Sequence, residues 1–230
     1  MPLSTAGSAR SLAFPAIARA RGKADPMARF SLAYESRTIV AGKTFLHEGD
    51  PAAMFFTITE GTVELVKLLS DGRRAILGFL FRGDIFGFSA EDSYDYNAEA
   101  VTPLILRRFP RRQLQRMYSD FPGMESQILK LVSRELAIAQ DHMVLLGRKS
   151  AHERVASFLL MLFHRIGRRD GWIELPMSRA DIADYLGLTT ETVSRVFTVL
   201  KASGCIVSSC SRVRISDVEA LAELAGGVAR

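Results

Sequence analysis

The stretch of sequence that decides the fold runs from Ser178 to Gly204 and reads SRADIADYLGLTTETVSRVFTVLKASG. Gly187 lies where a first helix should end, because glycine adopts a left-handed backbone at less cost than other residues. Before it, Ile182 and Leu186 are four residues apart with the small Ala183 between them, which lets a second helix cross closely. The stretch therefore predicts a helix-turn-helix.

The second predicted helix has one apolar and one polar side. Thr189 or Thr190 is suited to cap its first turn. Apolar residues then recur at spacings of three and four, namely Val193, Val196, Phe197 and Leu200. Polar residues lie on the opposite side, close to the helix N-terminus: Thr190, Glu191, Ser194 and Arg195. In helix-turn-helix proteins this end of the second helix enters the major groove of DNA.

The polar side has the chemistry needed to contact base pairs. An arginine donates two hydrogen bonds to guanine, and a glutamate accepts one from cytosine. Glu191 and Arg195 are four residues apart, so they can pair and hold both head groups at one G·C pair. An ordinary amphipathic helix with a solvated ion pair is the alternative. We expect base contacts from Thr190, Glu191, Ser194 and Arg195.

Contacts to the DNA backbone are expected around this helix. The segment IVSSCSRVRI at 206–215 predicts a wing hairpin, and WIELPM at 172–177 predicts a short strand before the helix-turn-helix. The expected backbone contacts are Ser178, Arg179, Thr189, Thr192, Arg212 and Arg214. A further helix is predicted after Gly147, and the basic residues near its start either contact phosphates or are solvated: Arg148, Lys149 and Arg154.

Short apolar segments separated by glycine and aspartate run from Phe45 to Phe88 and predict a β-barrel. The expected strands are FFTITEG at 55–61, TVELVKLL at 62–69, AILGFLF at 75–81 and AEAVTPLILRRF at 98–109, the last as one closing strand. SDGRR at 70–74 is expected to form a hairpin turn.

One long helix is predicted from Phe121 to Gly147. An apolar stripe repeats along it at spacings of three and four and consists of Leu129, Val132, Leu136, Ala139, Met143 and Leu146. An adjacent face carries Ile128, Leu131, Ile138 and Leu145. A stripe this wide can pack both on its own barrel and on a second copy, so we expect a homodimer. A helix buried within one subunit is the alternative.

The recognition-helix pattern resembles that of the CRP/FNR transcription regulators. Glu191, Ser194 and Arg195 match the E-x-x-S-R of the FNR-type branch, whereas CRP proteins have an arginine and a glycine where this chain has Thr190 and Ser194. The resemblance implies the half-site TTGAT rather than TGTGA. The segments at 145–160 and 175–195 are most similar to the FixK proteins of alphaproteobacteria, and the likeness covers roughly residues 28 to 217.

This resemblance implies an α+β protein with a jelly-roll barrel similar to cyclic-nucleotide-binding domains, a long dimerisation helix and a C-terminal winged helix-turn-helix. The expected boundaries are a flexible arm at 1–27, the barrel at 28–120, the dimer helix at 121–147 and the DNA-binding domain at 148–230. The implied function is that of a dimeric activator of low-oxygen genes that binds TTGAT-N4-ATCAA and contacts RNA polymerase.

CRP relatives bind a cyclic nucleotide through a G-E-[LIV] segment and a later R-[ST]-A segment. Here Phe88 stands at the acidic position, and Tyr94 or a neighbour stands at the arginine position. A cyclic phosphate would lack its bidentate cation and would be repelled by Glu91, Asp92 and Asp95. We therefore expect binding to DNA without cAMP. The alternative is a regulator gated by another small molecule in the barrel.

The numbers of cysteines and histidines limit which iron–sulfur, haem or metal sites the chain could hold. An FNR iron–sulfur cluster needs four cysteines, and the chain has only Cys205 and Cys210, so no such cluster is expected. Oxidation of these two thiols would disturb DNA binding, but thiols without a function are the other interpretation. His47 is the one barrel histidine, which argues against haem and against a cupin-like metal enzyme. We expect no cofactor, no metal and no catalysis.

Composition agrees with a DNA partner. The chain has 230 residues, 48% hydrophobic residues, a net charge of +5 and a pI near 9.5, which suit a polyanion. No apolar run approaches the roughly 20 residues of a membrane span, and no secretory signal is recognised. A cytoplasmic protein without a membrane partner is expected.

Overall fold

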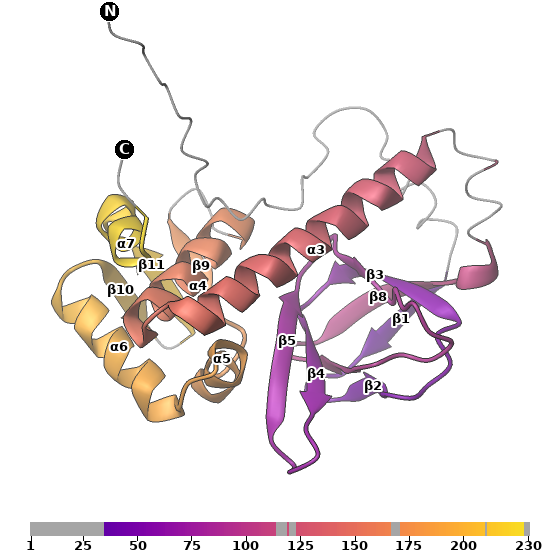
Figure 1. Ribbon diagram of the computed structural model, residues 1–230, viewed down its shortest axis with the longest axis horizontal. Helices are drawn as coiled ribbons and strands as arrows, with labels where there is room; N and C mark the ends of the chain where they lie inside the picture. Colours follow the sequence, from indigo (N-terminus) through magenta and orange to yellow (C-terminus); the bar gives the residue numbers. More distant parts are fainter. Residues whose placement is uncertain (1–34, 114–118, 120–122, 167–170, 210, 228–230) are drawn as a thin grey trace, which may run out of the picture.

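The computed structural model describes residues 35–113, 119, 123–166, 171–209 and 211–227. The arm predicted at 1–27 and the start of the long helix predicted at Phe121 lie outside these residues. Figure 1 shows a β-barrel and a mainly helical domain side by side, with one long helix, α3, running along both.

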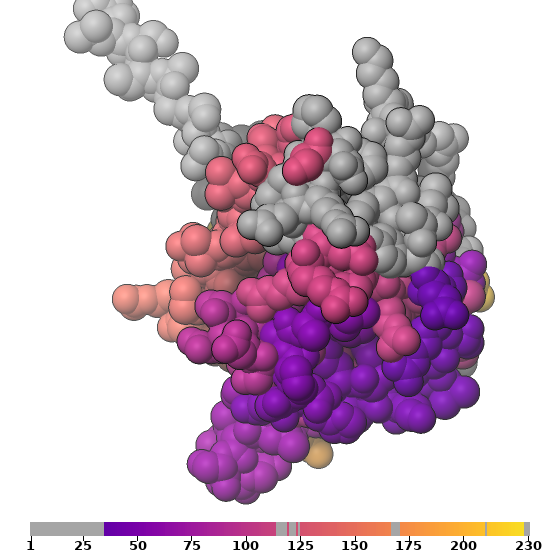
Figure 2. All heavy atoms as spheres, turned by 90° about the vertical axis from the view of Figure 1, so that its right-hand side faces the viewer, coloured from indigo at the N-terminus to yellow at the C-terminus, as the bar shows by residue number. Residues whose placement is uncertain are grey.

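The barrel is built from two antiparallel four-stranded sheets. The first has the order β1 (Ser36–Ile39), β8 (Leu104–Pro110), β3 (Met54–Glu60) and β6 (Ile85–Phe86). The second has the order β2 (Thr44–Leu46), β7 (Asn97–Ala100), β4 (Val63–Leu68) and β5 (Arg74–Leu80). Their inner faces enclose a core that includes Ile58, Val63, Leu104 and Leu106, so the predicted barrel is confirmed. Seen from the barrel side, its strands form a rounded surface from which the β4–β5 hairpin projects (Figure 2).

The single closing strand predicted at 98–109 is wrong. The chain forms β7 and β8 instead, and these two strands belong to different sheets. Pro103 lies between them, and proline has no amide hydrogen to donate to a strand neighbour. The chain therefore leaves one sheet there and continues in the other. A short 3-10 helix, η1 (Arg111–Gln113), follows β8.

The helical domain follows α3 (Met124–Arg148). It consists of α4 (Ala151–Ile166), β9 (Trp172–Glu174), α5 (Arg179–Leu186), α6 (Thr190–Ala202), β10 (Ile206–Ser209), β11 (Arg212–Ile215) and α7 (Val218–Leu224). The three strands form one sheet in the order β10-β11-β9, which confirms the predicted wing hairpin. Helix α7, which the sequence reading did not anticipate, begins where the Asp217 side chain accepts a hydrogen bond from the Ala220 amide.

The predicted helix-turn-helix is confirmed as α5 and α6. Gly187 ends α5 in the left-handed region, at φ 60° and ψ 44°. The Ser178 side chain caps α5 and forms a capping box with Asp181. Thr189 rather than Thr190 caps α6, because its hydroxyl accepts a hydrogen bond from the Thr192 amide at 3.2 Å. Two short helices thus cross at a fixed angle.

Two of the basic residues expected at phosphates or in solvent hold the domain together instead. Arg154 donates hydrogen bonds to the carbonyl oxygens of Leu146 and Lys149 at the end of α3, and of Leu186 and Gly187 at the turn. Lys149 donates to the Ser157 hydroxyl and to the carbonyl oxygen at the end of α7. One guanidinium thus ties the end of α3 to the helix-turn-helix.

Arg154→Gln is expected to lower the free energy of unfolding by about 2 kcal/mol, because several carbonyl groups lose a charged donor at once. Urea unfolding followed by circular dichroism measures this loss. Arg148→Gln is the matched control, since Arg148 is a nearby exposed arginine at the end of α3. Equal urea midpoints for the two variants would contradict the structural role of Arg154.

Candidate nucleic-acid interface

The first two turns of α6 present the polar side predicted to read DNA. Thr190, Glu191, Ser194 and Arg195 are all exposed. The opposite side of the helix is buried in the domain core through Val193, Val196, Phe197 and Leu200. Packing therefore fixes the rotation of α6 about its axis, and it is this rotation that turns the polar side outward.

Electrostatics at the start of α6 keep Glu191 ionised. Its own backbone amide and the Thr189 hydroxyl donate hydrogen bonds to the carboxylate, and the charge of Arg195 adds to them, so the pKa of Glu191 lies below its usual value. The structure shows no ion pair between Glu191 and Arg195 among the residues it describes. Both head groups are therefore available to a ligand, and the described residues do not include the expected pairing.

Arg179 at the start of α5 is held against the recognition helix. Its guanidinium carbon lies 3.4 Å from the centre of the Phe197 ring, a cation–π contact that leaves the side chain half-buried. Burial lowers the pKa of Arg179 from its ordinary value, but the group stays charged at neutral pH. The stack places a positive charge beside α6 before any DNA is present.

Three predicted backbone contacts already have local partners. The Ser178 hydroxyl is hydrogen-bonded to Asp181, and the Thr189 and Thr192 hydroxyls lie 3.0 Å apart. Their structural role is to cap the two helices, and their contact with DNA stays a prediction.

The wing carries two exposed arginines on one strand. The guanidinium carbons of Arg212 and Arg214 each lie 5.5 Å from the centre of the Trp172 ring on β9. Both cations thus gather beside one aromatic ring at the edge of the domain. Cys205, just before β10, is half-buried against the core, and Cys210 lies outside the described residues.

The apolar stripe predicted on the long helix is exposed. Leu136 and Met143 retain 59% and 64% of their accessible surface, and Leu129, Val132, Ala139 and Leu146 are also exposed. The adjacent face turns toward the rest of the chain, where Leu145 is 3% exposed. A helix buried within one subunit is therefore wrong. The seam predicted for a second copy is open in the single chain.

Comparison with known proteins identifies both halves of this architecture. Residues 36–121 match the family described as the cyclic nucleotide-binding domain, and residues 153–224 match the Crp-like helix-turn-helix domain. The nitrogen fixation regulation protein FixK of Bradyrhizobium diazoefficiens is 43% identical over 188 residues, which cover 79% of each chain. The chain belongs to the CRP/FNR family.

Two further relatives place it in the FixK-like branch. The transcriptional activatory protein AadR of Rhodopseudomonas palustris is 41% identical over 74% of this chain and 72% of its own. The solved structure of FixK2 from Bradyrhizobium japonicum superposes with a TM-score of 0.79 at 36% identity, covering 86% of this chain and 98% of that one. The protein is a DNA-binding transcription activator of this non-enzymatic family.

The barrel of this CRP/FNR protein does not fit a cyclic nucleotide. Tyr94 donates its hydroxyl hydrogen to the Met54 carbonyl oxygen at 2.6 Å and accepts from the Met54 amide at 3.1 Å. The Gly87 amide donates to the Tyr96 hydroxyl at 3.2 Å, and the Phe88 ring packs on Phe55 with the ring centres 4.8 Å apart. The hydroxyl groups of Tyr94 and Tyr96 are therefore already hydrogen-bonded to the backbone.

The loop at 89–93, where CRP relatives hold a cyclic phosphate, is held by hydrogen bonds within the protein. Arg111 donates to the carbonyl oxygens of Ser89 at 2.5 Å and of Glu91 at 3.3 Å. The Ser89 hydroxyl donates to the Ser93 carbonyl oxygen and accepts from the Glu91 amide. The Arg111 guanidinium is therefore occupied by backbone carbonyls. Arg111 could not be predicted from the sequence, because nothing in its local pattern points to a loop some 20 positions earlier.

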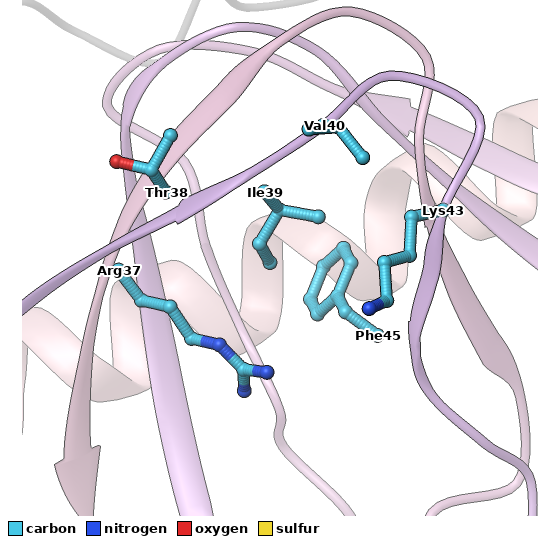
Figure 3. Close-up of a pocket in the computed structure, with 6 residues that line it drawn as sticks. All are labelled: Arg37, Thr38, Ile39, Val40, Lys43 and Phe45. Atoms are coloured by element: carbon cyan, nitrogen blue, oxygen red, sulfur yellow. The ribbon is translucent and has the colours of Figure 1, made fainter.

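Aromatic rings fill the barrel behind this loop. Phe56 stacks on Phe86 with the ring centres 5.0 Å apart, and Phe45 meets both rings edge-on. A hollow of about 140 Å³ lies on the β1–β2 side, lined by Arg37, Thr38, Ile39, Val40, Lys43 and Phe45 (Figure 3). Its volume is well below the roughly 300 to 1,000 Å³ of ordinary ligand pockets. It is too small to hold a nucleotide.

Within the described ranges, no three histidine, cysteine, aspartate or glutamate side chains are grouped as metal ligands. The same ranges contain no helix with the length and hydropathy to span a bilayer. His142, one of the scattered histidines, stacks on Tyr185 with the ring centres 4.3 Å apart, and burial lowers its pKa. The His142 side chain therefore packs within the protein, as expected for the scattered histidines.

Proposed function

We propose that two copies of this chain bind the inverted repeat TTGAT-N4-ATCAA without cAMP and activate genes of low-oxygen metabolism by contacting RNA polymerase. One observation carries the proposal. The four predicted base-contacting side chains are exposed together in the first two turns of α6, while the opposite side of that helix is buried in the core.

The choice of half-site rests on the residues of that surface. Thr190 and Ser194 stand where CRP proteins carry arginine and glycine, and Ser194 with Arg195 completes the FNR-type pattern. An arginine recognises guanine by donating hydrogen bonds to it, and a glutamate recognises cytosine by accepting one from it, so the two side chains together can specify a G·C pair. The four-residue spacing lets both reach the same G·C pair.

Dimerisation follows from the stripe on α3. Leu136, Met143 and their neighbours on the same side form a continuous apolar surface that a monomer would leave in water. A two-fold axis along this helix places two copies of α6 side by side, as a palindromic site requires. A second copy of the chain is the partner that satisfies both features.

Independence from cAMP is supported by the barrel. Tyr94, Tyr96 and Arg111 use their polar groups within the protein, and the hollow on the β1–β2 side has a volume of only about 140 Å³. A barrel gated by another small molecule is the second candidate, and native mass spectrometry of the purified protein tests it. A copurified ligand would favour gating.

The low-oxygen role is what the resemblance to FixK proteins implies, and the names of the relatives support the part that concerns activation. Three of them are named nitrogen fixation regulation protein FixK, and AadR of Rhodopseudomonas palustris and FnrL of Cereibacter sphaeroides are named as transcriptional activators. The polymerase contact belongs to the same inference, since an activator must recruit the enzyme.

The test is fluorescence anisotropy at one fixed salt concentration. Labelled duplexes carry TTGAT-N4-ATCAA, TGTGA-N6-TCACA or a scrambled site, each with and without cAMP. Tight binding to the first duplex alone, unchanged by cAMP, supports the proposal. A preference for the second duplex, or a requirement for cAMP, overturns it.

Arg212→Ala is expected to weaken binding to all three duplexes by a similar factor, because a wing arginine meets phosphates rather than bases. Each subunit loses about one phosphate contact, so the slope of log affinity against log salt falls by about one per subunit. Titrations at four salt concentrations measure the slope. A change confined to the TTGAT duplex would show that Arg212 reads a base.

A further inference from the structure

Arg74, at the first position of β5, joins the barrel to the helix-turn-helix. One terminal nitrogen of its guanidinium lies 2.9 Å from an Asp181 carboxylate oxygen and 3.6 Å from one of Asp184, both on α5. The other nitrogen pairs with Glu64 on β4 and lies 3.4 Å from a Glu99 oxygen on β7. One side chain thus contacts two sheet neighbours and the first helix of the DNA reader.

An apolar contact surrounds this ion cluster. Tyr185 on α5 packs on Phe79 of β5, on Phe158 of α4 and on His142 of α3, with ring centres 4.3 to 5.7 Å apart. The outer face of the barrel, including Phe79 and Phe81, belongs to the same buried cluster as the core of the helical domain. Figure 1 shows α5 beside β5, with α6 on the far side of it.

We infer that Arg74 is a positioning residue for DNA recognition, which locks α5 to the barrel through Asp181 and Asp184 and so sets where α6 lies relative to the dimer helix. The contact is made by Asp181 in the first turn of α5 and by Asp184 in the second. The reading surface of α6 takes no part in it and stays exposed. The lock is therefore compatible with bound DNA, and in a dimer it fixes the separation of the two reading helices.

Asp181 explains how the contact with Arg74 influences the position of α6. Its carboxylate accepts from the Ser178 amide and hydroxyl in the capping box while it also accepts from Arg74. The same residue therefore begins α5 and fastens it to the barrel. Since α5 and α6 cross at a rigid turn, a shift of α5 moves α6 with it.

Glu64 makes the lock sensitive to pH. Its side chain is 8% exposed, and burial raises its pKa to about 7, against the attraction of Arg74. The charged groups that face it are Arg74 on β5, Glu99 on β7, and Asp181 and Asp184 on α5. Ionised Glu64 repels the α5 carboxylates and competes for Arg74. Because its pKa in the folded chain is raised, the lock is strongest below the ordinary pKa of a glutamate and weakens as the pH rises through about 7.

The test compares Arg74→Gln with Arg73→Gln on the full inverted repeat and on a duplex with one half-site. Arg73 is the matched control, since it is exposed and, within the described part of the chain, its ion pair is with Asp71 in the hairpin turn. We expect Arg74→Gln to weaken full-site binding about tenfold while half-site binding changes less than about twofold, because only the separation of the readers is lost. Arg73→Gln should change neither.

Asp184→Asn and Glu64→Gln complete the design. Asp184→Asn should weaken full-site binding in the same way, and less than additively when combined with Arg74→Gln. Wild type should bind the full site about threefold more tightly at pH 6 than at pH 8, whereas Glu64→Gln should remove that difference. These two variants decide the question if Arg74→Gln does not fold.

Three results would overturn the inference: unchanged full-site binding by folded Arg74→Gln, equal losses on full and half sites, or a pH response retained by Glu64→Gln. The inference rests on the proposed reading by α6. If the wild type fails to bind the duplex, the proposed function fails; if only the lock variants behave as wild type, this inference alone fails.

Discussion

Arg195→Ala is expected to lower affinity for the TTGAT duplex about 5- to 150-fold, because a bidentate contact to guanine contributes roughly that much discrimination. The residue is exposed at the reading end of α6 and makes no ion pair with Glu191 in the described chain. Its removal therefore leaves the domain core untouched. Anisotropy with cognate duplexes and with duplexes changed at the contacted G·C pair measures the loss and the relaxed discrimination.

Lys201→Ala is the control for this experiment. Lys201 is an exposed cation in the last turn of the same helix, away from the reading end. It removes one positive charge without removing a base contact, so preference among duplexes should stay as in wild type. If Arg195→Ala kept full discrimination, α6 would enter the groove in another orientation.

Leu136→Glu combined with Met143→Glu is expected to convert the dimer to a monomer. Both side chains are exposed in the single chain, so glutamates there disturb its fold little, yet they bring four like charges together at a two-fold seam. Loss of the second reader removes the gain of simultaneous engagement, so affinity for the full site should fall by about 100-fold or more. Sedimentation equilibrium and anisotropy measure the two effects.

Lys130→Glu is the matched control on α3. Lys130 is exposed on another side of the helix, outside the apolar stripe. The Lys130→Glu variant should remain dimeric and bind the full repeat as tightly as wild type. A doubly substituted protein that still sediments as a dimer would reject this seam and with it the proposed symmetry of DNA binding.

Much of the DNA reader could be predicted because its signals act over short distances. The left-handed turn at Gly187, the cap at Thr189 and the apolar spacing from Val193 to Leu200 depend on neighbours within one or two helical turns. They also decide which side of α6 faces outward. The exposed stripe on α3 was predicted in the same way, although only packing showed which adjacent face turns inward.

Predictions failed where the partner of a residue lies far along the chain. The segment at 98–109 looked like one strand, since its pattern does not state that it changes sheets at Pro103. Arg154 was assigned to phosphate or solvent, and the structure places it on carbonyls from two helix ends. A charged side chain takes its role from whatever the fold brings near it.

The sequence by itself determined that this chain carries a helix-turn-helix with a polar reading face and a barrel without the acid and arginine of a cyclic-nucleotide site. The tertiary structure alone decided that Arg111 closes the empty loop and that Arg74 meets Asp181, 107 positions away. Helical periodicity and turns are local properties of the backbone. The pairing of buried charges depends on which surfaces the fold packs together.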